Sequence, residues 1–222
     1  MSLLLVSDLH KSIYPEEFYS INWLINLIND VKPDAVLSAG DWDEYVTPSD
    51  MYEVISRVSL ITIYGNHENF SLIKRYAISD GSIHVVKGLR VSGINGLIGE
   101  EDGLYTISID RFMNVIDKVK RRIGRPDIFI MHQPPYLPDQ YPWMRQDKFS
   151  EAALEAVNIL RPRLLLNGHM TGSCYNYGKY EWALTYAWIH PRDTSATQYL
   201  QSAIQGLRYL MMGNHSRTCP SK

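Results

Sequence analysis

Short apolar runs alternate along the chain with longer stretches in which apolar residues recur at helical spacing. Five runs are short and bounded by polar or turn-forming residues, which is typical of buried strands: residues 3–6, 35–39, 61–64, 128–131 and 164–166. Three stretches have the apolar period of helices: residues 15–30, 109–123 and 150–160. This alternation predicts an α/β fold in which parallel strands lie between helices.

Other segments depart from this alternation and predict a mixed strand arrangement. Residues 83–86 and 89–91 flank Lys87-Gly88 and are expected to form an antiparallel hairpin. After Gly172 the chain becomes aromatic and strand-like. Four prolines between residues 134 and 142 predict a stiff loop rather than a regular element.

Each of the five predicted strands leads into polar side chains that can bind metal or carry a proton. In chain order these are Asp8-Leu9-His10, Gly40-Asp41, Gly65-Asn66-His67-Glu68, His132 and Gly168-His169. Because the carboxyl ends of parallel strands meet at one edge of a sheet, we expect these residues to lie close together. Each motif alone is weak evidence, since a single histidine after a strand is more often an ordinary hydrogen-bonded residue. The complete ordered set is far more specific.

The residue types in this set suit a metal site. Carboxylate oxygen and neutral imidazole nitrogen bind divalent ions such as Mn, Fe, Zn, Ni and Co. Asp41 is central in the chain order and is the candidate to bridge two ions. Two ions about 3.5–4 Å apart can clamp a phosphoryl group and lower the pKa of a bound water to about 7. The resulting hydroxide can attack phosphorus in line, without a protein nucleophile.

Composition and charge narrow the class of protein. The 222 residues suffice for one sizeable core, so we expect one domain over residues 1–216 and a disordered tail over residues 217–222. The net charge of −2 gives no general attraction to nucleic acid or anionic lipid. Two cysteines form no disulfide framework. Since no apolar run resembles a signal peptide or reaches the roughly 18 residues of a membrane span, a cytoplasmic location without membrane attachment is expected.

The motifs Asp-x-His, Gly-Asp, Gly-Asn-His-Glu, His and Gly-His, in this order, resemble those of the calcineurin-like metallophosphoesterase superfamily. Residues 130–136 and 91–96 also look like segments of its small prokaryotic members. The motifs span residues 8 to 171, and Gly-Asn-His-Glu is the most specific of them. The resemblance implies a four-layer α/β/β/α sandwich of two mixed β-sheets flanked by helices. It also implies a dinuclear metal site at the carboxyl ends of the parallel strands.

The resemblance further implies a role for each motif residue. The first metal ion would be held by Asp8, His10 and Asp41. The second would be held by Asp41, Asn66, His132 and His169. His67 would face the substrate, where it stabilises charge on the phosphoryl group or protonates the leaving oxygen. Two divalent ions are therefore expected, with Mn favoured among Mn, Fe, Zn, Ni and Co.

One position departs from the family pattern. The family usually ends in Gly-His-x-His, whose second histidine completes the first metal site, but Thr171 stands there in this chain. The first site is therefore expected to bind metal weakly, to use a water molecule, or to recruit another group such as His190 or His215. We expect the second site to be filled more reliably.

The function expected from these features is hydrolysis of a small phosphomonoester or phosphodiester, nucleotides included, by metal-activated hydroxide. The alternative is a metal-binding scaffold of the same fold with weak or no catalysis, which the substitution at Thr171 favours. A nuclease is disfavoured by the low net charge. The residues leave the ester type, the substrate, the metal and the oligomeric state open.

Side chains near the motif loops allow two interpretations. Six aromatic residues either pack beneath the loops or form a stacking wall for a nucleoside or aryl group: Tyr14, Trp42, Tyr45, Tyr136, Tyr141 and Trp143. Lys11 and Arg145 either contact phosphate oxygens or are solvated at the surface.

Overall fold

The computed structural model describes residues 2–138, 144–169, 186–187, 196–201 and 208–213. The helices in these ranges are α1 (Pro15–Phe18), α2 (Ser20–Val31), α3 (Pro48–Ile55), α4 (Phe70–Ile73), α5 (Ile109–Ile123) and α6 (Lys148–Leu160). The strands of the amino-terminal half are β1 (Ser2–Val6), β2 (Ala35–Ser38), β3 (Ser59–Thr62), β4 (His84–Val86), β5 (Leu89–Ile94), β6 (Leu97–Gly99) and β7 (Thr106–Ser108). The later strands are β8 (Ile128–Met131), β9 (Leu164–Asn167), β10 (Tyr186–Ala187), β11 (Ala196–Gln201) and β12 (Arg208–Gly213). Among the described helices, none has the length and apolar character needed to cross a membrane.

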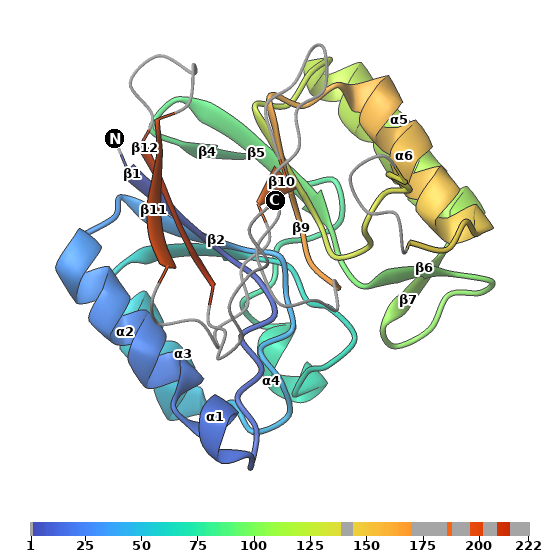
Figure 1. The fold of residues 1–222 in the computed structure, drawn as a ribbon. Coiled ribbons are helices and arrows are strands. Elements are labelled where there is room, and N and C mark those ends of the chain that lie inside the picture. The colour runs from blue at the N-terminus through green and yellow to red at the C-terminus, as the bar shows by residue number, and fades with distance from the viewer. Residues whose placement is uncertain (1, 139–143, 170–185, 188–195, 202–207, 214–222) are drawn as a thin grey trace.

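Most of the described strands form two five-stranded mixed sheets (Figure 1). The first sheet has the order β11-β12-β1-β2-β3, in which β11 runs antiparallel to β12 and the other pairs are parallel. The second sheet has the order β10-β9-β8-β5-β4, in which β4 runs antiparallel to β5 and the other pairs are parallel. The parallel strands within each sheet therefore bring their carboxyl ends to a common edge.

Three apolar clusters determine how the sheets and helices pack. One cluster lies between the sheets and joins Leu3 of β1 to Ile128 of β8 and Leu166 of β9. Because side chains alternate across a strand, the neighbouring Leu4 points the other way, into a cluster with α2 and α3. Phe129 of β8 likewise packs against α5 and α6. Figure 1 shows these helix pairs on opposite sides of the two sheets, so the packed layers run helices, first sheet, second sheet, helices.

The mixed α/β fold expected from the sequence is confirmed, and most element positions agree with the pattern. The antiparallel hairpin around Lys87-Gly88 is present as β4 and β5. The helix expected over residues 15–30 is wrong in one respect, because it is divided at Tyr19, where φ is −98° and ψ is 12°. The break was not visible in the sequence because one non-helical residue leaves the spacing of the apolar residues on either side unchanged. The expected extent of the domain and the disordered tail remain predictions, as residues 217–222 lie outside the described residues.

Helices α3 and α4 and the strand pair β6 and β7 were not predicted from the sequence. Helix α3 begins after Thr47, which forms a capping box with Asp50 and is followed by Pro48. The local signal Thr-Pro-x-Asp was therefore in the sequence, but the helix is only 8 residues long and its apolar period is short. The parallel pair β6 and β7 has 3 residues in each strand, too few to show a period.

The start of α6 provides a test of the local structure. The Asp147 carboxylate accepts hydrogen bonds from the backbone N–H groups of Phe149 and Ser150, at 2.8 Å each. Asp147→Ala should lower the free energy of unfolding by about 1 kcal/mol because these two N–H groups lose their acceptor. Urea unfolding followed by circular dichroism measures this difference. Glu155→Ala, at an exposed position within the same helix, is the matched control and should leave the stability almost unchanged.

Candidate metal centre

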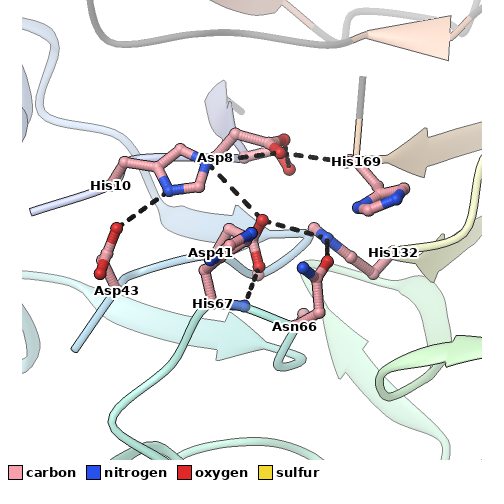
Figure 2. Close-up of polar contacts among 12 residues, drawn as sticks. Asp8, His10, Asp41, Asp43, Asn66, His67, His132 and His169 are labelled. Carbon is pink, nitrogen blue, oxygen red and sulfur yellow. Dashed lines mark hydrogen bonds and ion pairs between the residues drawn. The ribbon is translucent and has the colours of Figure 1, made fainter. Parts of the chain in front are cut away.

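Strand ends from both sheets meet at one edge of the structure. From the first sheet, β1 leads to Asp8 and His10, β2 to Asp41, and β3 toward Asn66 and His67. From the second sheet, β8 leads directly to His132, and β9 leads to His169. Figure 2 shows these side chains gathered around Asp41. The structure thus brings together every residue that the sequence proposed for the metal sites, with His67 beside them.

One group of possible ligands consists of Asp8, His10 and Asp41. Their candidate donor atoms all lie within 4.8 Å of one another. The Nε2 atom of His10 is 3.6 Å from Oδ2 of Asp41 and 3.9 Å from Oδ1 of Asp8. Asp8 and Asp41 are buried, with 3% and 1% of their surface exposed. These distances leave the donor atoms close enough to share a small cation.

A second group consists of Asp41, His132 and His169, again with donor atoms within 4.8 Å. The Nε2 atom of His132 is 3.2 Å from Oδ2 of Asp41 and 3.2 Å from Oδ1 of Asn66. The ring centroids of His132 and His169 are 5.3 Å apart. Asp41 belongs to both groups and therefore lies where a bridging ligand would have to be.

The backbone at this edge takes an uncommon conformation. The φ angle is 52° at Asp8, 47° at His10, 57° at Asp41 and 56° at His169. This left-handed region costs an ordinary side chain on the order of 1–3 kcal/mol, and such residues concentrate at functional sites. Backbone hydrogen bonds hold the first two loops together, from Asp8 N to the Gly40 carbonyl at 2.9 Å and from His10 N to the Asp41 carbonyl at 3.0 Å.

Two glycines make the close packing of the site possible. A Cβ atom at Gly65 would collide with Oδ1 of Asp41 and would lie 2.6 Å from the His132 ring. A Cβ atom at Gly168 would collide with Oγ of Ser7 and would lie 2.6 Å from Nδ1 of His132. Any side chain at either position would displace a proposed ligand.

Hydrogen bonds behind the ligands fix the orientation of two imidazoles. Nδ1 of His132 donates to the Ala39 carbonyl at 2.7 Å, which leaves Nε2 directed at Asp41. Nδ1 of His10 donates to Oδ2 of Asp43 at 3.1 Å. A metal-binding histidine commonly has its other ring nitrogen held in this way. Asp43 follows the second predicted strand but was given no role from the sequence, although its position two residues after Asp41 was a signal. A carbonyl such as that of Ala39 gives no signal at all.

Glu68 is a further residue to which the sequence analysis gave no role. It is buried, with 4% of its surface exposed, and its carboxylate accepts hydrogen bonds from the backbone N–H groups of Asp41, Trp42 and Gly65. Burial is the main cause that raises the pKa of Glu68, to about 8, with a contribution from the charge of Asp41. The available signal was its place as the last residue of Gly-Asn-His-Glu.

Asp41 and His132 stabilise each other's charge. Burial opposes ionisation of Asp41, but its interactions with His132 and His10 and the hydrogen bond from His67 N outweigh burial and lower its pKa to about 2. Burial likewise opposes protonation of His132, yet Asp41 and Asp8 raise its pKa to about 9. A proton on Nε2 of His132 therefore lies between Asp41 and Asn66 in the metal-free protein. A cation could replace that proton.

Burial and the charge of His132 also shift the pKa values of Asp8 and His169. Burial raises the pKa of Asp8, although His132 opposes this effect. Burial lowers the pKa of His169 to about 4, and the charge of His132 adds to the effect, so His169 is neutral at pH 7. A neutral imidazole is the form that binds metal.

The chain matches the family model described as calcineurin-like phosphoesterase over residues 1–172. It belongs to this family. No curated protein matches the chain. The sequence prediction of the superfamily is therefore confirmed.

Two solved structures share the fold of this calcineurin-like phosphoesterase and are distantly similar to it in sequence. A hypothetical protein from Thermus thermophilus has 11% identity and a TM-score of 0.51, covering 84% of this chain and 74% of its own. GAP50, the anchor in the inner membrane complex of Plasmodium, has 10% identity and a TM-score of 0.52. The match covers 96% of this chain and 78% of GAP50. At such low identity these structures are evidence for the fold alone.

The donor set of this calcineurin-like phosphoesterase fits divalent metal ions. Carboxylate, imidazole and amide donors suit Mn, Fe, Zn, Ni or Co. The left-handed ligand loops, the shared Asp41 and the imidazoles held through Nδ1 all occur at the same edge. The position of Thr171 lies outside the described residues, as do His190 and His215, so the weak first site remains a prediction.

The structure shows the surroundings of several neighbouring aromatic side chains. Trp42 is fully buried, and its Nε1 donates to Oγ1 of Thr62 at 3.0 Å, so it packs beneath the loops. Tyr14 and Tyr45 are exposed by 62% and 48%, and Tyr136 is half-buried. Tyr141 and Trp143 lie outside the described residues.

The two basic side chains lie in different surroundings. Nζ of Lys11 is 2.5 Å from Oδ2 of Asp50 and forms an ion pair between the first loop and α3. Arg145 is exposed.

The protonation of His132 predicts how metal binding depends on pH. Because a bound metal must replace the proton on Nε2, Mn²⁺ affinity should increase as pH rises from 6.5 to about 9. The effect on folding has the opposite sign, since a raised pKa stabilises the metal-free fold below pH 6.5 and this contribution is lost toward pH 9. Titration calorimetry in two buffers of different ionisation enthalpy measures the protons released per ion.

A histidine elsewhere in the fold provides the control for this titration. His84 is half-buried in β4 and contacts Oγ of Ser82 at 2.9 Å. His84→Gln should keep the same pH dependence of Mn²⁺ binding. Binding by the wild-type protein that does not change with pH would contradict the role given to His132.

Proposed function

We propose that this calcineurin-like phosphoesterase hydrolyses small phosphomono- or phosphodiesters, nucleotides among them, at a centre of two divalent metal ions. The observation that carries the proposal is the position of Asp41. Its Oδ2 atom lies 3.6 Å from Nε2 of His10 and 3.2 Å from Nε2 of His132. A carboxylate between imidazoles that follow strands of different sheets is suited to shared coordination of two ions.

The remaining ligands divide between the two ions. The first ion would be held by Asp8, His10 and Asp41. The second ion would be held by Asp41, Asn66, His132 and His169. When bound, two divalent ions neutralise phosphoryl charge and lower the pKa of a water molecule toward about 7. We take Mn as the first metal to test and the cytoplasm as the compartment.

Groups around the ligands would hold them in position before the metal ions bind. Asp43 and the Ala39 carbonyl hold His10 and His132 in the tautomers that direct Nε2 at Asp41. The hydroxyl of Ser7 donates to Oδ2 of Asp8 at 2.5 Å and limits its rotation. Ligands held before the metal arrives lose less conformational entropy on binding.

His67 is the proposed catalytic residue that is not a ligand. Its backbone N–H donates to Oδ1 of Asp41 at 2.9 Å, and its carbonyl accepts from Asp43 N at 2.9 Å. Its ring centroid is 5.5 Å from that of His10, and the residue is exposed. A side chain anchored beside the ligands yet open to solvent can donate a proton to the leaving oxygen or stabilise phosphoryl charge.

A non-catalytic scaffold is the second candidate function. GAP50 shares the fold and is described as an anchor, so a protein of this fold can have a structural role. The five other proposed ligands lie around the Asp41 carboxylate, and this arrangement favours the hydrolase for this chain.

Metal reconstitution distinguishes the two functions. Metal-stripped protein should hydrolyse aryl phosphomonoesters or diesters when Mn, Ni, Co, Zn or Mg is restored separately, with Mn among the active ions. The comparison also identifies the ester type. No hydrolysis with any of the five metals, together with one stoichiometric partner in a pulldown, would support the scaffold instead.

Replacement of His67 tests its separate role. His67→Ala should lower kcat by roughly 10²- to 10⁴-fold, because a general acid contributes about that much, while the bound metal stays near the wild-type amount. Elemental analysis of the purified variant measures the metal. His84→Ala, which removes a histidine of β4, serves as the control and should retain activity. Equal loss of metal and activity in His67→Ala would show that His67 is a ligand.

A further inference from the structure

Glu68 joins two of the loops that carry the proposed ligands. Its Oε1 atom accepts hydrogen bonds from Asp41 N at 2.8 Å and from Gly65 N at 3.0 Å. Its Oε2 atom accepts one from Trp42 N at 3.1 Å. Two of these donors belong to the loop after β2, and one belongs to the loop after β3. One buried carboxylate therefore binds backbone from both loops.

The conformation of the β2 loop creates the position that Glu68 fills. The φ angle is 95° at Gly40 and 57° at Asp41, and the consecutive N–H groups of Asp41 and Trp42 both donate to Glu68. Successive backbone N–H groups near left-handed residues form a concave anion-binding surface. Here the group in that position is a side chain of the protein, whose two oxygens accept the backbone hydrogen bonds. Its hydrogen bonds favour the left-handed conformation of Asp41 over the extended alternatives.

Further hydrogen bonds connect the same two loops. Oδ1 of Asp41 accepts from His67 N at 2.9 Å, and the His67 carbonyl accepts from Asp43 N at 2.9 Å. Asp43 and Glu68 also form a parallel backbone bridge. With Oδ1 of Asp41 bound to His67 N, Oδ2 is the oxygen that faces His10 and His132.

We propose that Glu68 is a positioning residue for the metal centre, which rests on the proposed function above. It holds the backbone of Asp41 so that Oδ2 lies between His10 and His132, where one carboxylate can serve two ions. Its own oxygens are occupied by three backbone N–H groups, so it acts through Asp41 rather than as a ligand. Loss of Glu68 should therefore weaken both metal sites, although none of their ligands is changed.

Glu68→Gln is the direct test. The amide keeps the size of the side chain but places an NH₂ group opposite a backbone N–H, so at least one of the three hydrogen bonds is lost. We expect Mn²⁺ affinity to fall about 10- to 100-fold, as for other residues that orient ligands, in protein that remains folded by circular dichroism. Titration calorimetry gives the affinity and the number of ions. Glu68→Asp is shorter by one methylene and should also bind Mn²⁺ more weakly than the wild type.

A partly buried carboxylate at the opposite edge of the second sheet is the matched control. Asp127, just before β8, accepts from Arg90 N at 2.9 Å and forms an ion pair with Arg163. Asp127→Asn should lower the stability of the protein while leaving its Mn²⁺ affinity at the wild-type value. A purely structural Glu68 would behave in the same way.

The possible failures are distinguishable. If the wild type binds two ions and Glu68→Gln binds them equally well, the positioning role is wrong and the proposed function stands. If the wild type binds no metal, the proposed function fails, and the positioning role fails with it. If neither Glu68→Gln nor Glu68→Asp folds, Glu68 belongs to the stability of the fold, and the positioning role is overturned.

Discussion

The ion pair between Asp41 and His132 joins the two sheets at the edge where the site lies. Asp41 follows β2 of the first sheet and His132 follows β8 of the second, and the two side chains are 1% and 0% exposed. Burial opposes the charge on both groups, but their mutual attraction at 3.2 Å, together with the neighbouring charges and hydrogen bonds, lowers the pKa of Asp41 to about 2 and raises that of His132 to about 9. The relative position of the sheets and the charge state of the site therefore depend on each other.

The backbone around this pair is strained, and a buried apolar core precedes it along the chain. Four proposed ligands hold left-handed backbone conformations, each unfavourable by on the order of 1–3 kcal/mol. The apolar cluster between the sheets, which contains Leu5, Leu37 and Ile130, directly precedes the ligand loops along the chain. Each fully buried side chain of this kind contributes roughly 1.5–3 kcal/mol, so the core readily offsets the cost of the loops. Packing of the apolar cluster, a few residues before each ligand, thus offsets the strained backbone conformations at the site.

The sequence predicted the ligands well because each one follows an apolar run, and the ends of parallel strands converge whatever the details of the loops. It could not predict the residues behind the ligands. Asp43 contacts His10 across 33 positions, and Ala39 contacts His132 across 93, so neither pairing has a local pattern. Helix α3 differs, because its capping signal at Thr47 was local and present in the sequence. The helix was not predicted because its apolar period was too short to recognise. Long-range contacts and short elements were the parts that sequence patterns did not resolve.

The charges at the site connect metal binding to the stability of the fold. Asp8 and Asp41 are carboxylates in a buried environment, where an uncompensated charge is costly. In the metal-free protein the proton on His132 supplies part of the compensation. Divalent ions at the same place would supply more positive charge and would bind only the folded arrangement of ligands, so their binding free energy adds to stability. The features that suit these strand ends to phosphoester chemistry, buried carboxylates and fixed imidazoles, are therefore also the ones through which a bound metal would hold the two sheets together.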